Sequence, residues 1–505
     1  MASKHERNVF ESAVQSDAPD VQIAIGVEPN AATRYARRKV DTTVLPLLFL
    51  GLLVFQLDRM NLASALTDGF AKDIAVNQNT INLGNQLMFL GIVVLEIPSN
   101  IILQRIGPRK WISAQVFIFG FVATLQVFVR NEAGFLVSRS FLGLCEAGYI
   151  PGGIYTLSTW YTKRELAKRV AIFFFGMFGG NAISPILASG ILQLGGRGGM
   201  KGWQWLFLRE SGRLPDVRTI DRTPVEGVFT MVVAILLLLL LPGSPDEPRP
   251  LLSPGLIRFT GVDREALRQH LETDDEEKKY GAQGMHIPLS LVWQTLKHYR
   301  RWASFVSTFA VFSTWSSLTT YTPTIIMALG FTRIQANLLA SVGGFLALGV
   351  VFFFGWLSDR TNKRGMAVII AHICYFVVLI VARSVHPSVG KWFRWGLWTT
   401  INAFAIGYHP VHNSWVQLNC KDPRERSISI AMWVMAAISG LMVGTQYYRA
   451  DDVPFYKKGL RIQIIMVAVG MLFAVLQEVV YVSYNRKVLR KWEAEGGKRP
   501  WLYTP

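Results

Sequence analysis

The amino-acid sequence predicts an all-α membrane protein with twelve transmembrane helices in two halves of six. Hydrophobic residues make up 51% of the 505 residues, a share too high for an ordinary soluble protein. Twelve apolar runs are long enough, at about 20 residues each, to cross a bilayer, and one long polar connection separates the sixth run from the seventh. The runs lie near residues 43–66, 80–103, 111–129, 134–159, 168–193, 203–241 (interrupted), 302–328, 333–356, 366–386, 394–417, 426–447 and 460–484.

Basic residues in the connections predict the orientation of these helices. Clusters of Lys and Arg precede the first run and follow the second, fourth, eighth, tenth and twelfth runs. Such residues are retained on the cytoplasmic side of a membrane, so we expect both termini in the cytoplasm, and a multi-pass protein of the plasma membrane. The ninth connection, with Arg383, Lys391 and Arg394, fits this alternation least well. The formal net charge of +18 is explained in this way, and no nucleic-acid partner is predicted.

The chain divides into five predicted segments. They are a disordered cytoplasmic tail at 1–42, a six-helix bundle at 43–242, a cytoplasmic linker at 243–301, a second six-helix bundle at 302–485, and a cytoplasmic tail at 486–505. The first forty residues contain no apolar stretch, so a cleaved signal peptide is not expected. The end of the linker is predicted to form an amphipathic surface helix, with Trp293 and Leu296 inward and Lys297 and Arg300 outward. The three cysteines predict neither a disulfide framework nor a metal site, and no cofactor is expected.

Residues 209–224 interrupt the sixth apolar run. These sixteen residues contain seven charges and two prolines, so they cannot lie in hydrocarbon. Two interpretations remain: the segment loops out at the outer face, or it is a translated intron, since its deletion restores one uninterrupted helix. Sequencing the transcript distinguishes them.

Two charged residues lie within the fourth apolar run, Arg139 and Glu146. Their separation of seven residues is close to two helical turns, so they share one face of the helix. Charged side chains at this depth face a water-filled cavity or a partner. We interpret them as part of a polar path through the membrane; the alternative is a structural ion pair between helices.

Related polar segments follow the second and eighth runs, at 100–110 and 355–364. They align at the same place in each half, as an internal duplication requires, so the two halves are predicted to be pseudo-symmetric. An acid followed by a basic cluster can bind a neighbouring helix terminus and latch the cytoplasmic side. The candidate gating residues are Gln104, which replaces the acid in the first half, with Arg105, Arg109, Asp359, Arg360 and Arg364.

These features resemble the major facilitator superfamily, whose Gly-x-x-x-Asp-Arg signature stands at 355–360. A narrower set of motifs is similar to the anion:cation symporter family, in its fungal allantoate permease-like branch. That set lies at 57–61, 96–100, 107–109, 146–148, 151–152, 160–161, 451–454 and 459, and the resemblance covers about 45–490. Its members take up carboxylates such as allantoate, ureidosuccinate, nicotinate or pantothenate together with protons, and the fold implied is two six-helix bundles around a pseudo-two-fold axis.

The resemblance also implies roles for four residues. It maps coupling and substrate binding to Asp58, Arg59, Arg139 and Glu146. An arginine can bind a carboxylate through two donors and stays charged when partly buried, and we expect Asp58 to pair with Arg139. Glu146, in an apolar wall, is expected to bind and release a proton. A span-end anchor is the alternative for Asp58 and Arg59.

Three further polar residues inside the runs are weaker candidates. Tyr321 and Asn413 are assigned to substrate binding, and His409 to proton coupling. A histidine titrates near physiological pH, but a buried histidine is as often a packed hydrogen-bonding residue.

The predicted function is proton-coupled symport of a small organic anion by alternating access, in a monomer. No nucleotide-binding loop or catalytic triad occurs in the sequence, so no enzyme is predicted. Two alternatives stay open: an exporter of a small metabolite by proton antiport, and a transport-incompetent sensor, since the interrupted sixth run is able to disable the first half.

Overall fold

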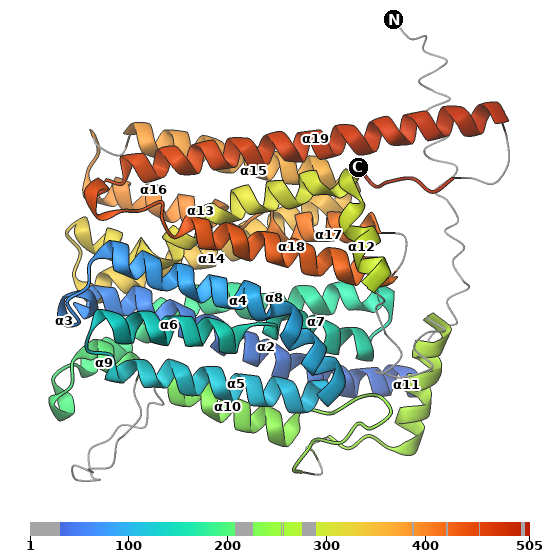
Figure 1. Ribbon diagram of the computed structural model, residues 1–505, viewed down its shortest axis with the longest axis horizontal. Coiled ribbons are helices and arrows are strands. Elements are labelled where there is room, and N and C mark those ends of the chain that lie inside the picture. The colour runs from blue at the N-terminus through green and yellow to red at the C-terminus, as the bar shows by residue number, and fades with distance from the viewer. Residues whose placement is uncertain are drawn as a thin grey trace, which may run out of the picture.

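The computed structural model describes residues 31–207, 226–253, 255, 257–274, 289–385, 388–420, 423–453, 455–495 and 500–505. Within these ranges the regular secondary structure is helical, as predicted. Long helices run side by side; α11 (Gly261–Asp274) and α12 (Leu289–Lys297) lie at one end, α3 (Phe70–Asp73) and α9 (Gly202–Phe207) at the other (Figure 1). We call the first end the linker face and the second the far face. Residues 1–30 of the predicted tail and the segment 209–224 lie outside the described residues.

Each of the twelve predicted runs falls on a helix or on a pair of helices. The N-terminal half contains α2 (Ala31–Thr67), α4 (Gln78–Ile106), α5 (Pro108–Leu125), α6 (Glu132–Glu146), α7 (Tyr149–Trp160), α8 (Lys163–Ile191), α9 and α10 (Glu226–Leu240). The C-terminal half contains α13 (Trp302–Ala328), α14 (Arg333–Thr361), α15 (Arg364–Val385), α16 (Lys391–Phe404), α17 (His409–Leu418), α18 (Pro423–Gly444) and α19 (Lys457–Glu495). Short 3₁₀ turns lie at Gln126–Phe128, Leu192–Leu194, Arg197–Gly199, Tyr299–Arg301 and Ala450–Asp452.

Two predicted spans are broken rather than continuous. The fourth breaks between α6 and α7, where Ala147 is extended and Gly148 has a φ of 83°, a conformation that glycine adopts readily. The tenth breaks between α16 and α17, and Pro410 follows in the first turn of α17, where its missing N–H costs nothing.

The predicted boundary at residue 42 is also corrected, because α2 begins at Ala31. Ion pairs hold its basic first turns. They join Arg37 to Glu165 of α8 at 2.6 Å, Lys39 to Asp263 of α11 at 2.7 Å, and Asp41 to Arg169 of α8 at 3.0 Å. At the other end of the chain α19 continues to Glu495, ten residues beyond the predicted end of the bundle. Residues 31–42 and 486–495 are therefore helical.

Glu165 is the centre of this cluster at the linker face. Its Oε1 accepts from Arg37 and lies 3.4 Å from Nε2 of His270 in α11. Burial raises the pKa of Glu165, but the hydrogen bonds and charges of His270 and Arg37 outweigh it and lower this pKa to about 2. The carboxylate therefore stays ionised and binds the linker helix to the first bundle.

The end of the linker differs from its prediction. Trp293 is 60% exposed, so it points outward rather than inward. Instead, Thr295 is buried where α12 packs against α18. An exposed tryptophan beside Lys297 is typical of the membrane–water interface.

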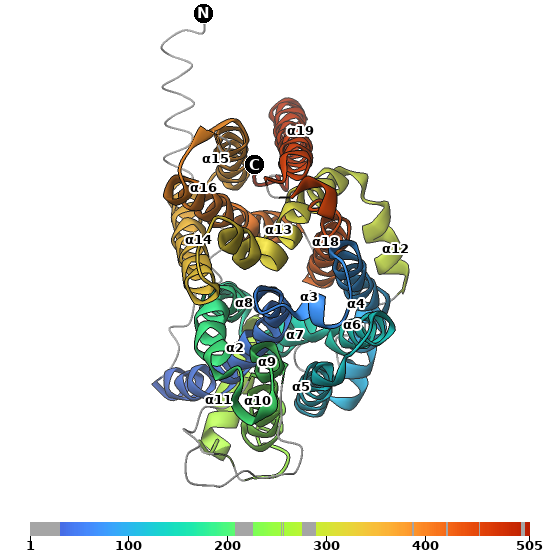
Figure 2. The same cartoon turned by 90° about the vertical axis from the view of Figure 1, so that its left-hand side faces the viewer.

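The two halves meet along three pairs of helices. Here α8 packs against α14, α4 against α18, and α2 against α13. Figure 2, which looks onto the far face, shows the C-terminal half above the N-terminal half with these helices at the junction. A central site between the halves is therefore lined by helices of both.

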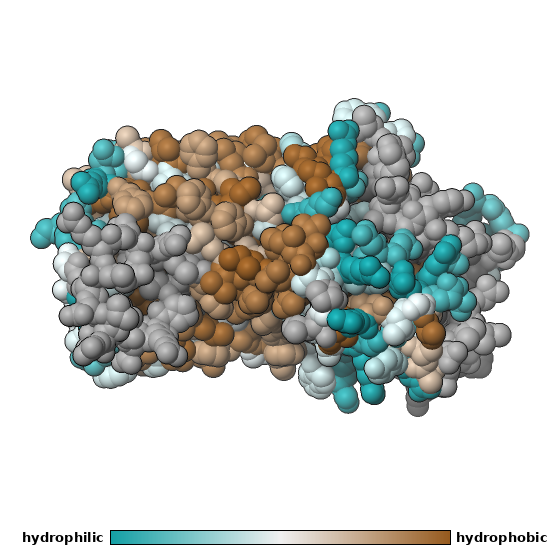
Figure 3. Space-filling view, turned by 90° about the horizontal axis from the view of Figure 1, so that it is seen from below, coloured by the Kyte–Doolittle hydropathy of each residue, from teal (hydrophilic) through white to brown (hydrophobic). Residues whose placement is uncertain are grey.

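The outer surface is that of a membrane protein. Figure 3 shows a band of apolar side chains across the middle of one side, with hydrophilic residues concentrated toward the linker face. Large exposed apolar residues include Phe117, Phe141, Phe352 and Leu472. In the described ranges, seven helices are each long and apolar enough to cross a membrane alone. The other predicted spans are broken, as in α6 and α7, or rich in serine and threonine, as in α13.

Candidate functional site

The two charged residues of the fourth span lie on one face of α6, as predicted. Asn131 caps this helix by accepting from the backbone N–H of Gly134 at 2.8 Å. Arg139 and Glu146 are each 1% exposed and face the interior of the protein. Because Glu146 is the last residue of α6, its carboxylate lies directly at the break in the span.

Arg59 of α2 forms the ion pair with Glu146. Its Nε donates to Oε2 of Glu146 at 2.7 Å, and its guanidinium lies over the ring of Phe55 at 4.1 Å. Helix α2 continues for eight residues beyond Arg59, so Arg59 is not a span-end anchor. The ion pair thus joins the first and fourth spans.

Arg139 is connected to the C-terminal half instead. Its Nη2 donates to Oδ1 of Asn85 in α4, and Nδ2 of Asn85 donates to Oγ1 of Thr320 in α13 at 3.2 Å. This chain of side chains is a polar contact that crosses between the halves. The expected pairing of Asp58 with Arg139 stays a prediction.

A cavity lies between the halves at this level. Its volume is about 40 Å³, below the range of small-molecule sites, so the protein is closed tightly around it in this conformation. Arg59, Arg139 and Asn85 line it from the first half, and Trp315, Thr320 and other residues of α13 and α18 from the second. Among the described residues, Nη2 of Arg59 and Nε and Nη1 of Arg139 have no hydrogen-bond partner. Buried donors of this kind normally have partners, and an anion is the ligand that suits them.

Hydrogen bonds between the halves close the side of the cavity toward the far face. The hydroxyl of Tyr321 donates to Oδ1 of Asn82 at 2.5 Å, and Nδ2 of Asn82 donates to the carbonyl of Tyr448 at 2.8 Å. Nearer the surface, Arg333 pairs with Asp68 and Asn337 donates to Oγ1 of Thr67 at 2.9 Å. We call these contacts the far seal. Tyr321, predicted to bind substrate, lies in this seal and not among the residues that line the cavity.

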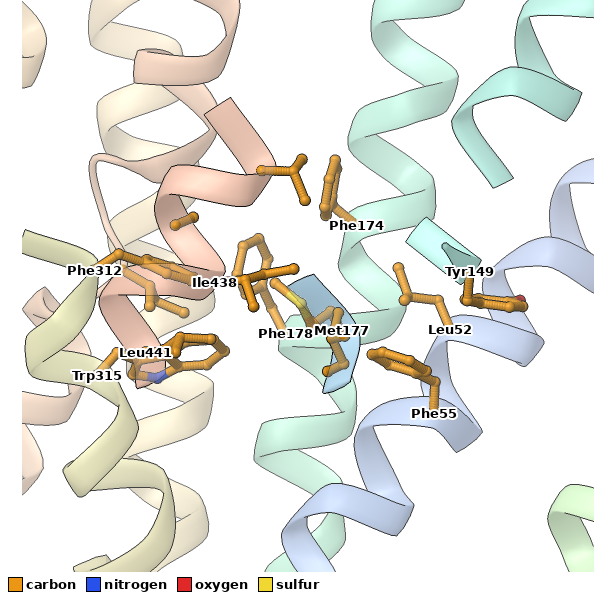
Figure 4. Packing of buried hydrophobic residues seen from close by; sticks show 14 of the residues in the cluster. Leu52, Phe55, Tyr149, Phe174, Met177, Phe178, Phe312, Trp315, Ile438 and Leu441 are labelled. Carbon is orange, nitrogen blue, oxygen red and sulfur yellow. The ribbon is translucent and has the colours of Figure 1, made fainter. Parts of the chain in front are cut away.

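Aromatic side chains close the other side, toward the linker face. Phe312 stacks on the ring of His409, with centroids 4.5 Å apart, and Phe178 of α8 meets the same ring edge-on at 6.0 Å. Trp433 lies 4.5 Å away. Figure 4 shows Phe312 and Ile438 from the C-terminal half facing Phe178 of α8. We call this group the aromatic layer. His409 belongs to it and is not among the residues that line the cavity.

Two other predicted residues lie away from the cavity. Asp58 is fully buried on the side of α2 near α10, where its Oδ1 accepts from Thr230 at 3.2 Å. Asn413 is buried in α17, and its Oδ1 accepts from Nε2 of Gln417 at 3.1 Å. Arg59 and Arg139 therefore line the cavity, and Glu146 is connected to it through its ion pair with Arg59. The residues that line the cavity do not include Asp58, His409, Tyr321 or Asn413.

The predicted gating residues lie at the linker face, within their own halves. Arg364 donates to Oδ1 of Asp359 at 2.5 Å, and Arg360 lies over Trp356. In the first half Arg109 pairs with Glu247 of the linker at 2.9 Å, while the side chains of Gln104 and Arg105 are exposed. A latch between the halves at this face stays a prediction for another conformation.

Two residues of the site, and one carboxylate outside it, were missed from the sequence. Asn85 and Thr320 read as ordinary polar residues of apolar runs, because only the packed structure shows that they connect the halves. Glu96 is different: a carboxylate within the second run is an intramembrane ionisable residue, and that signal was readable.

Comparisons with known proteins agree with this architecture. A family model described as Major Facilitator Superfamily matches residues 48–210 and 225–445, so that the match leaves out residues 211–224. An uncharacterised transporter of Saccharomyces cerevisiae is 25% identical over 90% of this chain and 81% of its own length. A putative tartrate transporter of Agrobacterium vitis is 26% identical over 67% of this chain and 68% of its own length.

Solved structures share the fold. A bacterial homologue of the human lysosomal transporter Spinster, in an inward-facing and unoccupied conformation, superposes with a TM-score of 0.61 at 14% identity, over 90% of this chain and 98% of that one. The xylose transporter XylE of E. coli, partially occluded and inward open, gives 0.57 at 14% identity, over 85% and 96%. The family match and the two-bundle architecture agree, and the chain is a membrane transporter, not an enzyme, that belongs to the Major Facilitator Superfamily.

Proposed function

We propose that this transporter carries a small organic anion together with protons, and that Arg59, Arg139 and Glu146 form its substrate and coupling site. The observation that supports this most is a pair of buried guanidinium groups that both line one cavity, each with at least one nitrogen that has no hydrogen-bond partner. Substrates with a carboxylate can accept from both arginines at once. The relative described as a putative tartrate transporter is consistent with a carboxylate substrate.

Coupling follows from competition for Arg59. When Glu146 is ionised it occupies Nε of Arg59 at 2.7 Å and cancels its charge. When Glu146 binds a proton, the ion pair is lost and Arg59 becomes available to an incoming anion. Proton and anion therefore favour each other's binding, as a symporter requires. We take the linker face as cytoplasmic, so the far seal is the outer gate.

The test is uptake in cells that lack their own carboxylate permeases. Radiolabelled allantoate, nicotinate, pantothenate and tartrate are supplied at acid and neutral external pH. We expect one of them to accumulate more at acid pH, and to do so less when a protonophore is added. Secretion or resistance in place of accumulation would favour the exporter, and no movement of any substrate in either direction would favour the sensor.

Variants then test the site. We expect Glu146→Gln to abolish accumulation driven by the pH gradient but to retain exchange of labelled for unlabelled substrate, because exchange needs no net proton movement. Arg59→Ala should lose both. Arg383→Ala, which changes an exposed arginine at the end of α15, is the matched control. Proton-coupled uptake that is unchanged in both site variants would remove this assignment.

A further inference from the structure

The break between α6 and α7 leaves backbone groups inside the membrane without helical partners. Two side chains from neighbouring helices bind them. Nε2 of Gln115 in α5 donates to the carbonyl oxygens of Ala147 and, at 3.3 Å, Cys145. The backbone N–H of Gly148 donates to Oε2 of Glu96 in α4 at 2.9 Å. Since an unpaired backbone group costs several kcal/mol in hydrocarbon, these two side chains stabilise the break.

Of these two side chains, only Glu96 can change its charge. It is 2% exposed, its Oε1 has no hydrogen-bond partner, and no cation lies within ion-pairing distance of it in the described part of the chain. The positive charge whose field acts on it is Arg59, which is already bonded to Glu146. An ionised carboxylate held in this way lacks a counterion, and binding a proton relieves that cost.

The surrounding helices supply few other ionisable groups. Helix α6 offers Cys145 and Glu146 near the break and Arg139 two turns before it, and α7 offers the tyrosines at 149 and 155. The charged residues of α5 are confined to its first turn, and those of α18 to its start. We therefore expect the binding of a proton by Glu96 to depend mainly on its hydrogen bond with Gly148 and on the buried charges of Arg59, Arg139 and Glu146.

Glu96 and Arg59 hold the same short segment from two sides. Arg59 binds the side chain of Glu146, and Glu96 binds the backbone two residues further on. We infer that Glu96 is a second proton-binding residue, a positioning residue that controls the break at Gly148 and, through it, the Arg59–Glu146 pair. Its place in coupling rests on the proposed function.

The physical step is the gain or loss of one O–H bond. Ionised Glu96 accepts a charge-assisted hydrogen bond from Gly148, and these are roughly twice as strong as neutral ones. A proton on Glu96 weakens that bond and leaves an O–H group that needs an acceptor. The break then loosens, and the carboxyl group of Glu146 can move away from Arg59. The proton comes from water and returns to it.

Infrared spectroscopy of the purified full-length protein in liposomes tests proton binding without any substrate. As the pH is lowered, protonated buried carboxyl groups produce C=O bands in the difference spectrum. We expect Glu96→Gln to remove one band, and Glu146→Gln to remove another. Glu96→Asp should shift the band rather than remove it, and so separates proton binding from misfolding. Gln115→Leu, which disturbs the same break without changing a carboxyl group, should leave both bands.

Transport supplies the second readout. With the carboxylate that the parent protein accumulates, we expect Glu96→Gln to keep exchange within about twofold and to flatten the pH profile of uptake. A residue that only holds the break would instead lower uptake equally at every pH. If the difference spectra of Glu96→Gln and of the parent contain the same bands, the inference about Glu96 is overturned. The proposed function still stands in that case if the parent couples uptake to protons. If Glu96→Gln removes its band but the parent protein carries no organic anion, the proposed function alone is refuted.

Discussion

The replacement of Arg139 by glutamine tests the binding site most directly. The parent guanidinium donates to Asn85 and has two further nitrogens, Nε and Nη1, without partners at the cavity. Glutamine can keep a hydrogen bond to Asn85 but brings no positive charge. A bound carboxylate therefore loses at least one charge-assisted hydrogen bond, which contributes about 1.5–3 kcal/mol. At about 1.4 kcal/mol for each factor of ten, the KM should rise roughly 10- to 150-fold.

The assay is initial-rate uptake of the accumulated carboxylate across a concentration series. Expression and detergent stability are measured on the same preparations, so that a folding defect is recognised. Arg139→Lys keeps the charge but not the planar donor group, and its KM should fall between those of the parent and Arg139→Gln. The reasoning fails if a well-folded Arg139→Gln protein has a KM within twofold of the parent.

Three other changes test the surrounding structure. Gly148→Ala places a Cβ against Oγ of Ser99, at a residue whose φ is 83°. We expect about 1–2 kcal/mol of backbone strain plus a steric clash, and therefore a lower yield of folded protein that Ser99→Gly partly restores. Tyr321→Phe removes a hydrogen bond of the far seal that contributes about 0.5–1.5 kcal/mol, so a cysteine placed at Met60 should react faster with an external thiol reagent. Because the pKa of Glu165 is lowered, its contribution to the stability of the fold is present above its ordinary pKa near 4.5 and is lost as the pH falls toward 2. Glu165→Gln should remove this contribution at neutral pH and speed proteolysis of the linker. An equal rate of cleavage in the variant and the parent would contradict the contact between Glu165 and the linker helix.

The helical spans and the charged pair could be predicted from the sequence because both depend on local composition. Apolar runs of sufficient length form helices in a bilayer, since the backbone has no other partners there. Arg139 and Glu146 could be recognised because charged side chains are costly within an apolar membrane span. Their spacing of seven residues, close to two helical turns, predicted that both side chains lie on the same face of the helix.

The break at Gly148 was not predicted, because hydropathy records apolar character and not backbone direction. Ala147 and Gly148 continue an apolar run, and the carboxyl group that binds the freed N–H comes from Glu96, fifty-two residues away. Tyr321 shows a related limit. Its position on α13 was known, but whether it faces the cavity or the opposite half depends on how the two bundles pack.

The two closures of the cavity differ in chemistry, and this difference bears on how the transporter opens. The far seal consists largely of hydrogen bonds such as those of Asn82, and water can replace each at a net cost of about 0.5–1.5 kcal/mol. The aromatic layer around Phe312 and His409 contains stacked rings, so opening it exposes apolar area at a cost of about 25 cal/mol per Å².

A ligand shifts the equilibrium between a closed and an open state only through its different affinity for the two states. The arginine site lies between the closures, and Arg139 reaches α13 through Asn85 and Thr320. An anion that draws Arg139 away from Asn85 would loosen this link between the halves, and so connect binding in the cavity to their relative movement.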